Sequence, residues 1–505
     1  MGLNSQILTI KDPTIKLDEI QTLDLGENET GAPVDSMNAA YQPFVKINGY
    51  VFDYNEITNF NLKVVDKYPE LTMTLRDSME IFSVATFPRD GDVLSLRIKA
   101  RNETFKDVRM DFHIIDFKNT TPVGTREKAR GGATYNVRAY AKLPGLYTDD
   151  CKSYGRATSY DHILNIAEDL QLGFATNVDA TDDEMVRLCA YQSKLELLND
   201  TVLHSYISDD TFQTFGIDQY YYINFVDLQK IFDAPEDIEL TEIVNSNFLV
   251  KERAQDSDES EGQLESQLIL TNHHNYTNTS NHIIAHNLIN NSTKIALENG
   301  YRRKVQYFDI NKNMVDADDT LNEFDVESLV SANIKDHEEP LKGRRNSDTD
   351  EYATHIKHKY VGLQDSTPAD GNVHMNWHYS AINNIQNLVE LDKMKLVVEL
   401  ATPNPAIYRY SKVPVVMFSY SKGGVGTIEQ TAENAQEKGF GESTAGENSS
   451  TNTSDDNATQ NGFIQDPFLS GFYVVMGIEY KYNGGSITQV LHLTRKEWPA
   501  RMNNV

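Results

Sequence analysis

The sequence has very little cysteine, only Cys151 and Cys189 in 505 residues. Two cysteines are too few for a disulfide framework in a chain of this size, so we expect two reduced thiols in a protein made in a reducing cytoplasm. The first 30 residues lack the basic start and apolar core of a signal peptide. No run approaches the ~18 consecutive apolar residues of a membrane span. A secreted, β-rich adhesin is therefore a weak hypothesis, despite the acidity and the Asn and Thr content.

Basic residues are also scarce: 46 Lys and Arg stand against 75 Asp and Glu, for a formal charge of −29. Nucleic-acid affinity comes chiefly from Lys and Arg that neutralise phosphates, so this composition argues against a surface that grips DNA or RNA. An acidic surface or channel wall would instead repel DNA and let it slide. Specific nucleic-acid binding is not expected.

The length predicts two to four domains, because single hydrophobic cores stop growing near ~250–300 residues. From residue 43 onward, short apolar or alternating segments are divided by turn residues such as those at 88–91 and 131–132. Evenly spaced short strands of this kind predict a β-barrel or sandwich. The expected strands are 44–52, 71–75, 93–98, 110–117 and 135–140.

The period becomes helical after residue 145. Ser159 is expected to cap a helix that ends before Gly173. A second helix should open with Ser193 and Glu196, which have the spacing of a capping box. An apolar, aromatic run over 220–226 predicts a strand. Residues 148–236 are thus expected to form a small α+β domain.

Strand-like segments resume beyond an acidic loop at 251–266, and a polar stretch at 421–461 predicts a disordered insertion. The later strands are expected at 267–270, 304–308, 395–400, 413–418, 471–482 and 488–493. The predicted fold is mainly β with α+β: two similar antiparallel β-barrel domains and the small α+β domain. The expected boundaries are an N-terminal extension at 1–42 that orders only against a neighbour, a first barrel at 43–147, the α+β domain at 148–236, a second barrel with associated elements at 237–420, the insertion at 421–464 and a hairpin at 465–505 that completes the second barrel.

A similarity between two segments of the chain supports two similar barrels. The strands at 110–117 and 135–140 form a hairpin pattern that closes on a proline, and 471–480 with 488–493 repeat it. Hairpin signals are generic, so two unrelated hairpins remain the alternative.

Several motifs that could carry chemistry are incomplete. The stretch from Asp309 begins like a calcium loop, but Met314 and Thr320 replace the required Gly and Glu. His282 and His286 could share a helix face, yet the Glu of a zinc hydrolase motif is missing between them. Further histidines, expected to be satisfied or exposed, are His273, His274, His355, His358, His374 and His378.

Paired carboxylates at Asp209-Asp210 and at 182–184 are the raw material of a glycosidase, but adjacency in sequence does not supply the required separation of ~5–9.5 Å. The glycine-rich stretch 423–426 lacks the Lys and Ser/Thr end of a phosphate loop. We therefore predict no catalytic, metal or cofactor site and no enzymatic activity. An enzyme that cleaves carbohydrate or peptidoglycan through paired carboxylates remains the alternative.

Two blocks resemble the tail hub family of contractile machines, which includes phage baseplate hubs and the hub portion of type VI secretion spike proteins. The first block runs over residues 208–226 and contains SDDTF, GID and YYINFV. The second runs over 467–499 and contains PFLSGFYVV, IEY and EWP. The order of barrel, α+β domain and barrel strengthens the resemblance.

The resemblance implies a virion structural protein of the tail baseplate that is assembled in the host cytoplasm. In that family three subunits, each with two barrels, form a ring that adapts a sixfold tail tube to a threefold spike around a channel for DNA ejection. The partners implied are two further copies of the chain, a tail tube or tube-initiator protein, a separate central spike protein, the tape-measure protein and, as a further option, baseplate wedge proteins.

Overall fold

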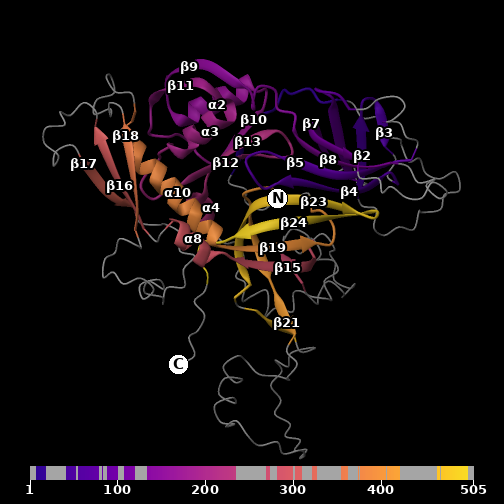
Figure 1. Cartoon of the computed structure of the whole chain (residues 1–505). Coiled ribbons are helices and arrows are strands. Elements are labelled where there is room, and N and C mark those ends of the chain that lie inside the picture. Colours follow the sequence, from indigo (N-terminus) through magenta and orange to yellow (C-terminus); the bar gives the residue numbers. More distant parts are fainter. Residues whose placement is uncertain are drawn as a thin grey trace, which may run out of the picture.

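The structure is a computed structural model, and most of the residues it describes lie in β-strands (Figure 1). A set of segments separated by gaps is described: 7–18, 41–52, 55–78, 82, 88–100, 107–119, 133–234, 269–272, 281–299, 302–309, 321–326, 354–361, 373–374, 376–404, 406–420, 463–466, 468–496 and 498. The calcium-like stretch after Asp309, the insertion at 421–461 and the glycines at 423–426 lie outside these residues.

One 13-stranded sheet runs through the molecule, in the order β15-β19-β24-β23-β4-β5-β8-β7-β6-β2-β3, with β20 and β14 attached beside β23. Its strands from the first half of the chain are β2 (Tyr41–Ile47), β3 (Tyr50–Phe52), β4 (Ile57–Val64), β5 (Glu70–Asp77), β6 (Val93–Ala100), β7 (Val108–Asn119) and β8 (Ala133–Ala141). Those from the second half are β14 (Leu270–Thr271), β15 (Ile283–Asn290), β19 (Met394–Leu400), β20 (Lys412–Val416), β23 (Gly471–Asn483) and β24 (Ser486–Thr494).

The prediction of two separate barrels is not confirmed. Among the described residues, no ladder closes either half of the large sheet into a barrel. Instead β23 pairs antiparallel with β4, with Tyr480 opposite Leu62 and Lys481 opposite Asn61. This ladder joins the two halves into a single open sheet. The alternating apolar residues that predicted two barrels instead pack their side chains into one core shared by both halves.

The two hairpins singled out in the sequence are both present as long antiparallel ladders. The β7–β8 ladder has a register shift between Ile114 and Asp116, and the β23–β24 ladder has one between Val475 and Gly477. Such bulges bend and twist a hairpin. Whether the hairpins mark a duplication stays a prediction. The expected strand at 44–52 is itself a tight hairpin, because Asn48 and Gly49 adopt positive φ angles of 50° and 82° and turn the chain between β2 and β3.

In Figure 1 the α+β unit lies beside the strands β2–β8 and above β15, β19 and β24. Its four-stranded sheet has the order β1-β10-β13-β12, and β9 and β11 form a separate two-stranded ribbon. The elements are β1 (Leu8–Lys11), β9 (Asp149–Ala157), α2 (Ser159–Asp169), β10 (Gly173–Thr176), β11 (Met185–Ser193), α3 (Lys194–Leu203), β12 (Gln213–Ile217), β13 (Tyr222–Asp227) and α4 (Leu228–Phe232).

The two predicted helices of this unit begin close to where the sequence places them. The capping box of α3 is confirmed: Ser193 accepts a hydrogen bond from Glu196 N, and Glu196 accepts one from Ser193 N. The cap of α2 is Thr158, whose side chain accepts from Asp161 N, and not Ser159, which is the first helical residue. Thr158 has the extended backbone that a cap requires, with φ −73° and ψ 162°.

The remaining elements come from the second half of the chain. Helix α10 (Trp377–Lys393) runs diagonally between the α+β unit and the region of α8 (Ser292–Asn299) (Figure 1). A three-stranded sheet has the order β17-β16-β18, and a short pair joins β21 to β22. These strands are β16 (Arg302–Asp309), β17 (Leu321–Val326), β18 (Thr354–Val361), β21 (Phe418–Tyr420) and β22 (Phe463–Gln465).

Candidate functional site: buried polar junctions between the units

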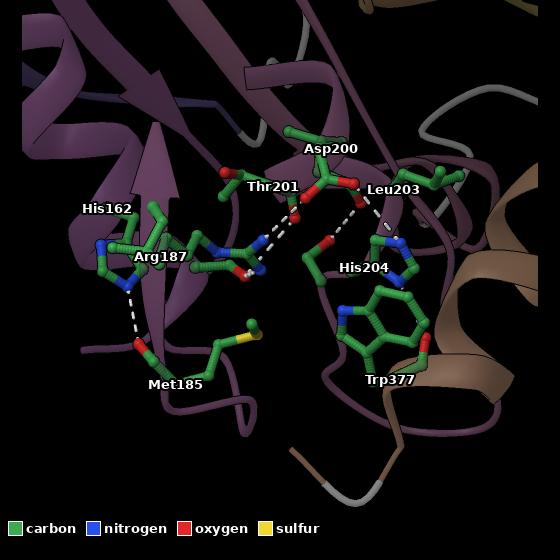
Figure 2. Close-up of polar contacts among 12 residues, drawn as sticks. His162, Met185, Arg187, Asp200, Thr201, Leu203, His204 and Trp377 are labelled. Carbon is green, nitrogen blue, oxygen red and sulfur yellow. Dashed lines mark hydrogen bonds and ion pairs between the residues drawn. The ribbon is translucent and has the colours of Figure 1, made fainter. Parts of the chain in front are cut away.

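A buried arginine, Arg187, lies within the α+β unit and pairs with Asp200, whose side chain is half exposed. Arg187 of β11 donates from Nη2 to Ser159 Oγ at 3.0 Å, and its Nη1 lies 3.4 Å from Asp200 Oδ2 (Figure 2). Burial lowers the pKa of the Arg187 guanidinium, and the charges of Asp200 and Asp183 counter that effect. Asp183 is only 1% exposed and accepts from the backbone N–H of Ser159 at 2.9 Å and of Tyr206 at 3.0 Å. The network therefore ties α2, β11 and α3 together.

The same network reaches helix α10 through His204. The imidazole of His204 stacks on Trp377, with ring centroids 3.7 Å apart and planes 6° from parallel (Figure 2). His204 Nδ1 lies 2.8 Å from Trp377 O, and its Nε2 lies 3.5 Å from Asp200 Oδ1. His374 completes the contact, because its Nε2 lies 2.9 Å from His204 O. Burial lowers the pKa of His374 and so favours its neutral form.

Asparagines hold α10 against the end of α3. Asn384 Nδ2 donates to the carbonyls of Val202 at 3.2 Å, Leu203 at 3.0 Å and Ser205 at 3.2 Å. The last carbonyls of a helix lack partners within that helix, and the Asn384 amide supplies a donor to two of them. Val202 O also accepts from Ser205 N at 3.2 Å. Asn384 Oδ1 in turn accepts from Gln213 N at 2.9 Å, at the start of β12.

Arg409 forms a second junction, where three parts of the chain meet. Its guanidinium donates to Val65 O at 2.7 Å and Asp66 O at 2.6 Å in the β4–β5 turn, and its Nε donates to Met476 O at 2.9 Å in β23. A Cβ added to Gly216 of β12 would lie 2.2 Å from Arg409 Nη1. One buried cation therefore connects both halves of the large sheet with the α+β unit.

Lys67 lies beside this junction. Its Nζ is 3.3 Å from Phe215 O and 4.3 Å from the centroid of the Phe215 ring. Burial, aided by the nearby charge of Arg409, lowers the pKa of Lys67 to about 8. The Lys67 carbonyl also accepts from Ile217 N at 2.8 Å, and this hydrogen bond holds the β4–β5 turn against β12.

Three of the five acids at 182–184 and 209–210 make structural contacts. Asp183 caps backbone N–H groups, as described above, and Glu184 lies 3.6 Å from Arg156. Asp209 accepts from the Tyr206 hydroxyl at 2.9 Å. Asp183, Glu184 and Asp209 therefore contribute to contacts within the α+β unit.

The interpretation of His282 and His286 as neighbours on a helix is wrong. His286 lies in strand β15, opposite Val398 of β19, and His282 precedes that strand. The intervening Ile283 and Ile284 are β-branched and favour the strand. Among the described residues, no group of three His, Cys, Asp or Glu side chains is arranged to hold a metal ion. Cys151 is exposed and Cys189 is buried, and both are free thiols.

Arg187, Asn384 and Arg409 had no signal in the sequence. Each is a polar residue whose partners lie in other parts of the chain, and Arg409 is separated from Val65 by 344 positions. The signal nearest to them was the block at 208–226, because Gln213 and Gly216 contact Asn384 and Arg409. Within the described segments, no helix is both long and apolar enough to cross a bilayer.

Comparison with known proteins gives matches in structure. No protein-family model matches the sequence, and no curated protein matches it. The 43 kDa tail protein of prophage MuSo2 from Shewanella oneidensis is 9% identical, with 90% of this chain and 98% of that chain covered and a TM-score of 0.46. A tail protein from Neisseria meningitidis is 8% identical, with 90% and 97% covered and a TM-score of 0.44.

A third match is to a component of the type VI secretion system of E. coli, which is described as structurally similar to tail proteins of bacteriophage T4. It is 8% identical, with 89% of this chain and 76% of that chain covered and a TM-score of 0.37. These matches are to tail proteins and a type VI secretion component, the classes of protein that the two sequence blocks resemble. At these identities the likeness is one of fold alone.

Proposed function

We propose that this chain is the structural hub of a phage tail baseplate and has no enzymatic activity. The observation that carries the proposal is the β23–β4 ladder, which fuses two hairpin-containing halves of one chain into a single sheet. The buried side chain of Arg409 also bridges the two halves, because it donates to Met476 O in β23 and to Val65 O just after β4. A chain built in this way presents two related surfaces at a fixed relative orientation.

Three such chains would supply six related docking surfaces around one axis. A closed ring of identical chains is the usual outcome of repeated head-to-tail contacts whose rotation closes. With two related halves per chain, a threefold ring fits a sixfold tail tube on one side and a threefold spike on the other. The proposed partners are therefore two further copies, a tube or tube-initiator protein, a spike protein and the tape-measure protein.

The acidic charge of −29 fits a ring around a DNA channel. A wall that carries excess carboxylates repels phosphates, so DNA would pass without being retained. The proposed location is the tail baseplate of the virion.

Light scattering on purified protein tests the proposal. We expect a mass near three times 57.2 kDa, rising toward that value as salt screens the charge of the chain. Negative-stain images of the same sample should then show rings with a central opening. A protein that stays monomeric at high concentration, even with its tube and spike proteins added, would contradict the proposal.

A further inference from the structure

The N-terminal arm, residues 7–18, adds a strand to the edge of the α+β sheet. β1 pairs antiparallel with β10, with Leu8 opposite Thr176 and Thr9 opposite Ala175. The arm then donates from Thr14 N and Ile15 N to Gln171 O at 3.0 and 3.1 Å. These contacts are mainly backbone hydrogen bonds to a sheet edge and a helix end.

Side chains add two further attachments. The Tyr222 hydroxyl donates to Asp12 Oδ1 at 2.6 Å, and Lys11 Nζ pairs with Glu168. At the far end of the arm, Asp18 N donates to Asp111 Oδ2 at 2.9 Å on β7. Every one of these partners is equally available on a second copy of the chain.

The arm packs Ile7, Ile15 and Leu17 against the hydrophobic core but leaves two other apolar side chains exposed. Leu8 is 64% exposed and Ile10 is 49% exposed, although both belong to a paired strand. β1 is also the outer strand of its sheet, so its second edge is unpaired among the described strands. Exposed apolar side chains on an edge strand are typical of a surface that another chain covers.

The connection between the arm and the large sheet is much longer than the path within one chain requires. Residues 19–40 join Asp18 to Tyr41. Asp18 is held on β7, and Tyr41 lies on β2, two strands away across β6. Asp111 lies level with Lys46 of β2, so Tyr41 is about 10 Å away across the sheet and about 17 Å further along the strand, a separation of roughly 20 Å. A link of this length can span up to about 70 Å, which is enough to reach a neighbouring subunit.

We propose that, in the assembled ring, the arm of each copy pairs with β10 of the next copy. The inference rests on the proposed function for the presence of neighbouring copies. Exchange of an identical element between subunits reproduces the contacts of the arm, so it is a low-cost way to join copies. It also places Leu8 and Ile10 at the border between subunits. An acidic chain thereby gains a contact built from backbone hydrogen bonds, which do not depend on net charge.

Disulfide trapping tests the exchange. Thr9→Cys would be placed in one version of the full chain and Ala175→Cys in a second, larger tagged version, both with Cys151→Ser and Cys189→Ser. Leu8→Cys with Thr176→Cys provides a second pair, because successive antiparallel positions alternate in Cα separation. Co-expression should give a covalent species containing one chain of each size, which reductant converts back to single chains.

A variant with both cysteines of a pair in the same chain is the matched control. Exchange predicts a ladder up to three covalently linked chains in denaturing gels without reductant, whereas an arm that stays on its own chain gives only single chains with an internal bridge. If light scattering shows a trimer and the bridges are all internal, exchange is wrong and the proposed function stands. A chain that stays monomeric at high concentration, even with its tube and spike proteins added, would contradict both the exchange and the proposed function.

Deletion of residues 1–18 gives a second, thiol-independent measurement. Exchange predicts that the shortened chain keeps its circular dichroism spectrum but dissociates at a protein concentration at least tenfold higher than the full chain. An unchanged concentration dependence would overturn the exchange even if neither cysteine pair oxidised.

Discussion

The guanidinium of Arg409 lies so close to the backbone of Gly216 that no side chain fits between them. A Cβ at Gly216 would meet Nη1 at 2.2 Å and Cζ at 2.6 Å. The guanidinium has no freedom to retreat, because its three donor nitrogens already bond the carbonyls of Val65, Asp66 and Met476. Glycine is needed at this position for space.

Gly216→Ala should therefore lower the stability of the whole chain. We expect the free energy of unfolding to fall by about 1–3 kcal/mol, since the new methyl group must displace the hydrogen-bonded guanidinium of Arg409. Thermal unfolding followed by circular dichroism measures the effect. Gly155→Ala is the matched control, because a Cβ there meets nothing within 4 Å and should change stability little. Equal melting temperatures for the two variants would show that the seat of Arg409 can relax.

Asn384→Leu should loosen helix α10 from the α+β unit. The substitution removes a donor from the carbonyls of Val202, Leu203 and Ser205 and the acceptor of the buried Gln213 N–H, at a cost of roughly 2–4 kcal/mol. Val202 O keeps its hydrogen bonds from Ser205. Hydrogen exchange should rise in α10 and at the end of α3 before it rises in the large sheet. Asn199→Leu, at an exposed position of α3, is the control. Unchanged protection in α10 would mean that Asn384 does not hold the helix.

Glu479 should make the β23–β4 ladder, which joins the two halves of the sheet, sensitive to acid. Burial opposes its charge, but hydrogen bonds from His492 at 2.8 Å and Asn61 at 2.9 Å outweigh burial and lower the pKa to about 2 from 4.5. The stabilisation is complete above pH 4.5 and is lost as the pH falls toward 2. Urea unfolding at several pH values should show roughly 2–3 kcal/mol lost over this range, and less in Glu479→Gln. Parallel curves would contradict the assignment.

Asp227 should have the opposite effect. Burial raises its pKa to about 6 from 3.8, although its carboxylate accepts from Gln229 N at 3.0 Å at the start of α4. The folded state thus binds a proton more tightly than the unfolded state, so stability falls as the pH rises from 3.8 through 6. Asp227→Asn keeps an acceptor oxygen without charge. At pH 8 its free energy of unfolding should exceed that of the wild type by about 1–3 kcal/mol, and below pH 4 the difference should disappear. A variant less stable at pH 8 would refute this.

Local signals in the sequence predicted local structure well. Ser193 and Glu196 satisfy one another within a single helical turn, so the capping box could be identified without knowing the fold. Helix α10 was not predicted, because Asn383, Asn384 and Asn387 occupy its buried face and disguise the apolar period. Polar residues on a buried face make sense only once their partners on other elements are known.

Long-range pairing escaped the sequence for a related reason. Alternating apolar residues predict strands, but they do not say which strand lies beside which. β23 could have closed on its own half, as the prediction of two barrels assumed, and it pairs with β4 instead. The junction residues Arg187 and Arg409 likewise resemble ordinary surface cations until the fold surrounds them.

The β23–β4 ladder also has a consequence for biosynthesis. Residues 59–64 leave the ribosome long before their partners at 478–483, a delay of about 20–80 s at typical translation rates of ~5–20 residues per second. Throughout that interval the nascent chain displays an unpaired β4 edge, with Phe60 and Leu62 beside it. Until β23 emerges, this edge is open to pairing with the same edge of neighbouring nascent chains on a polysome.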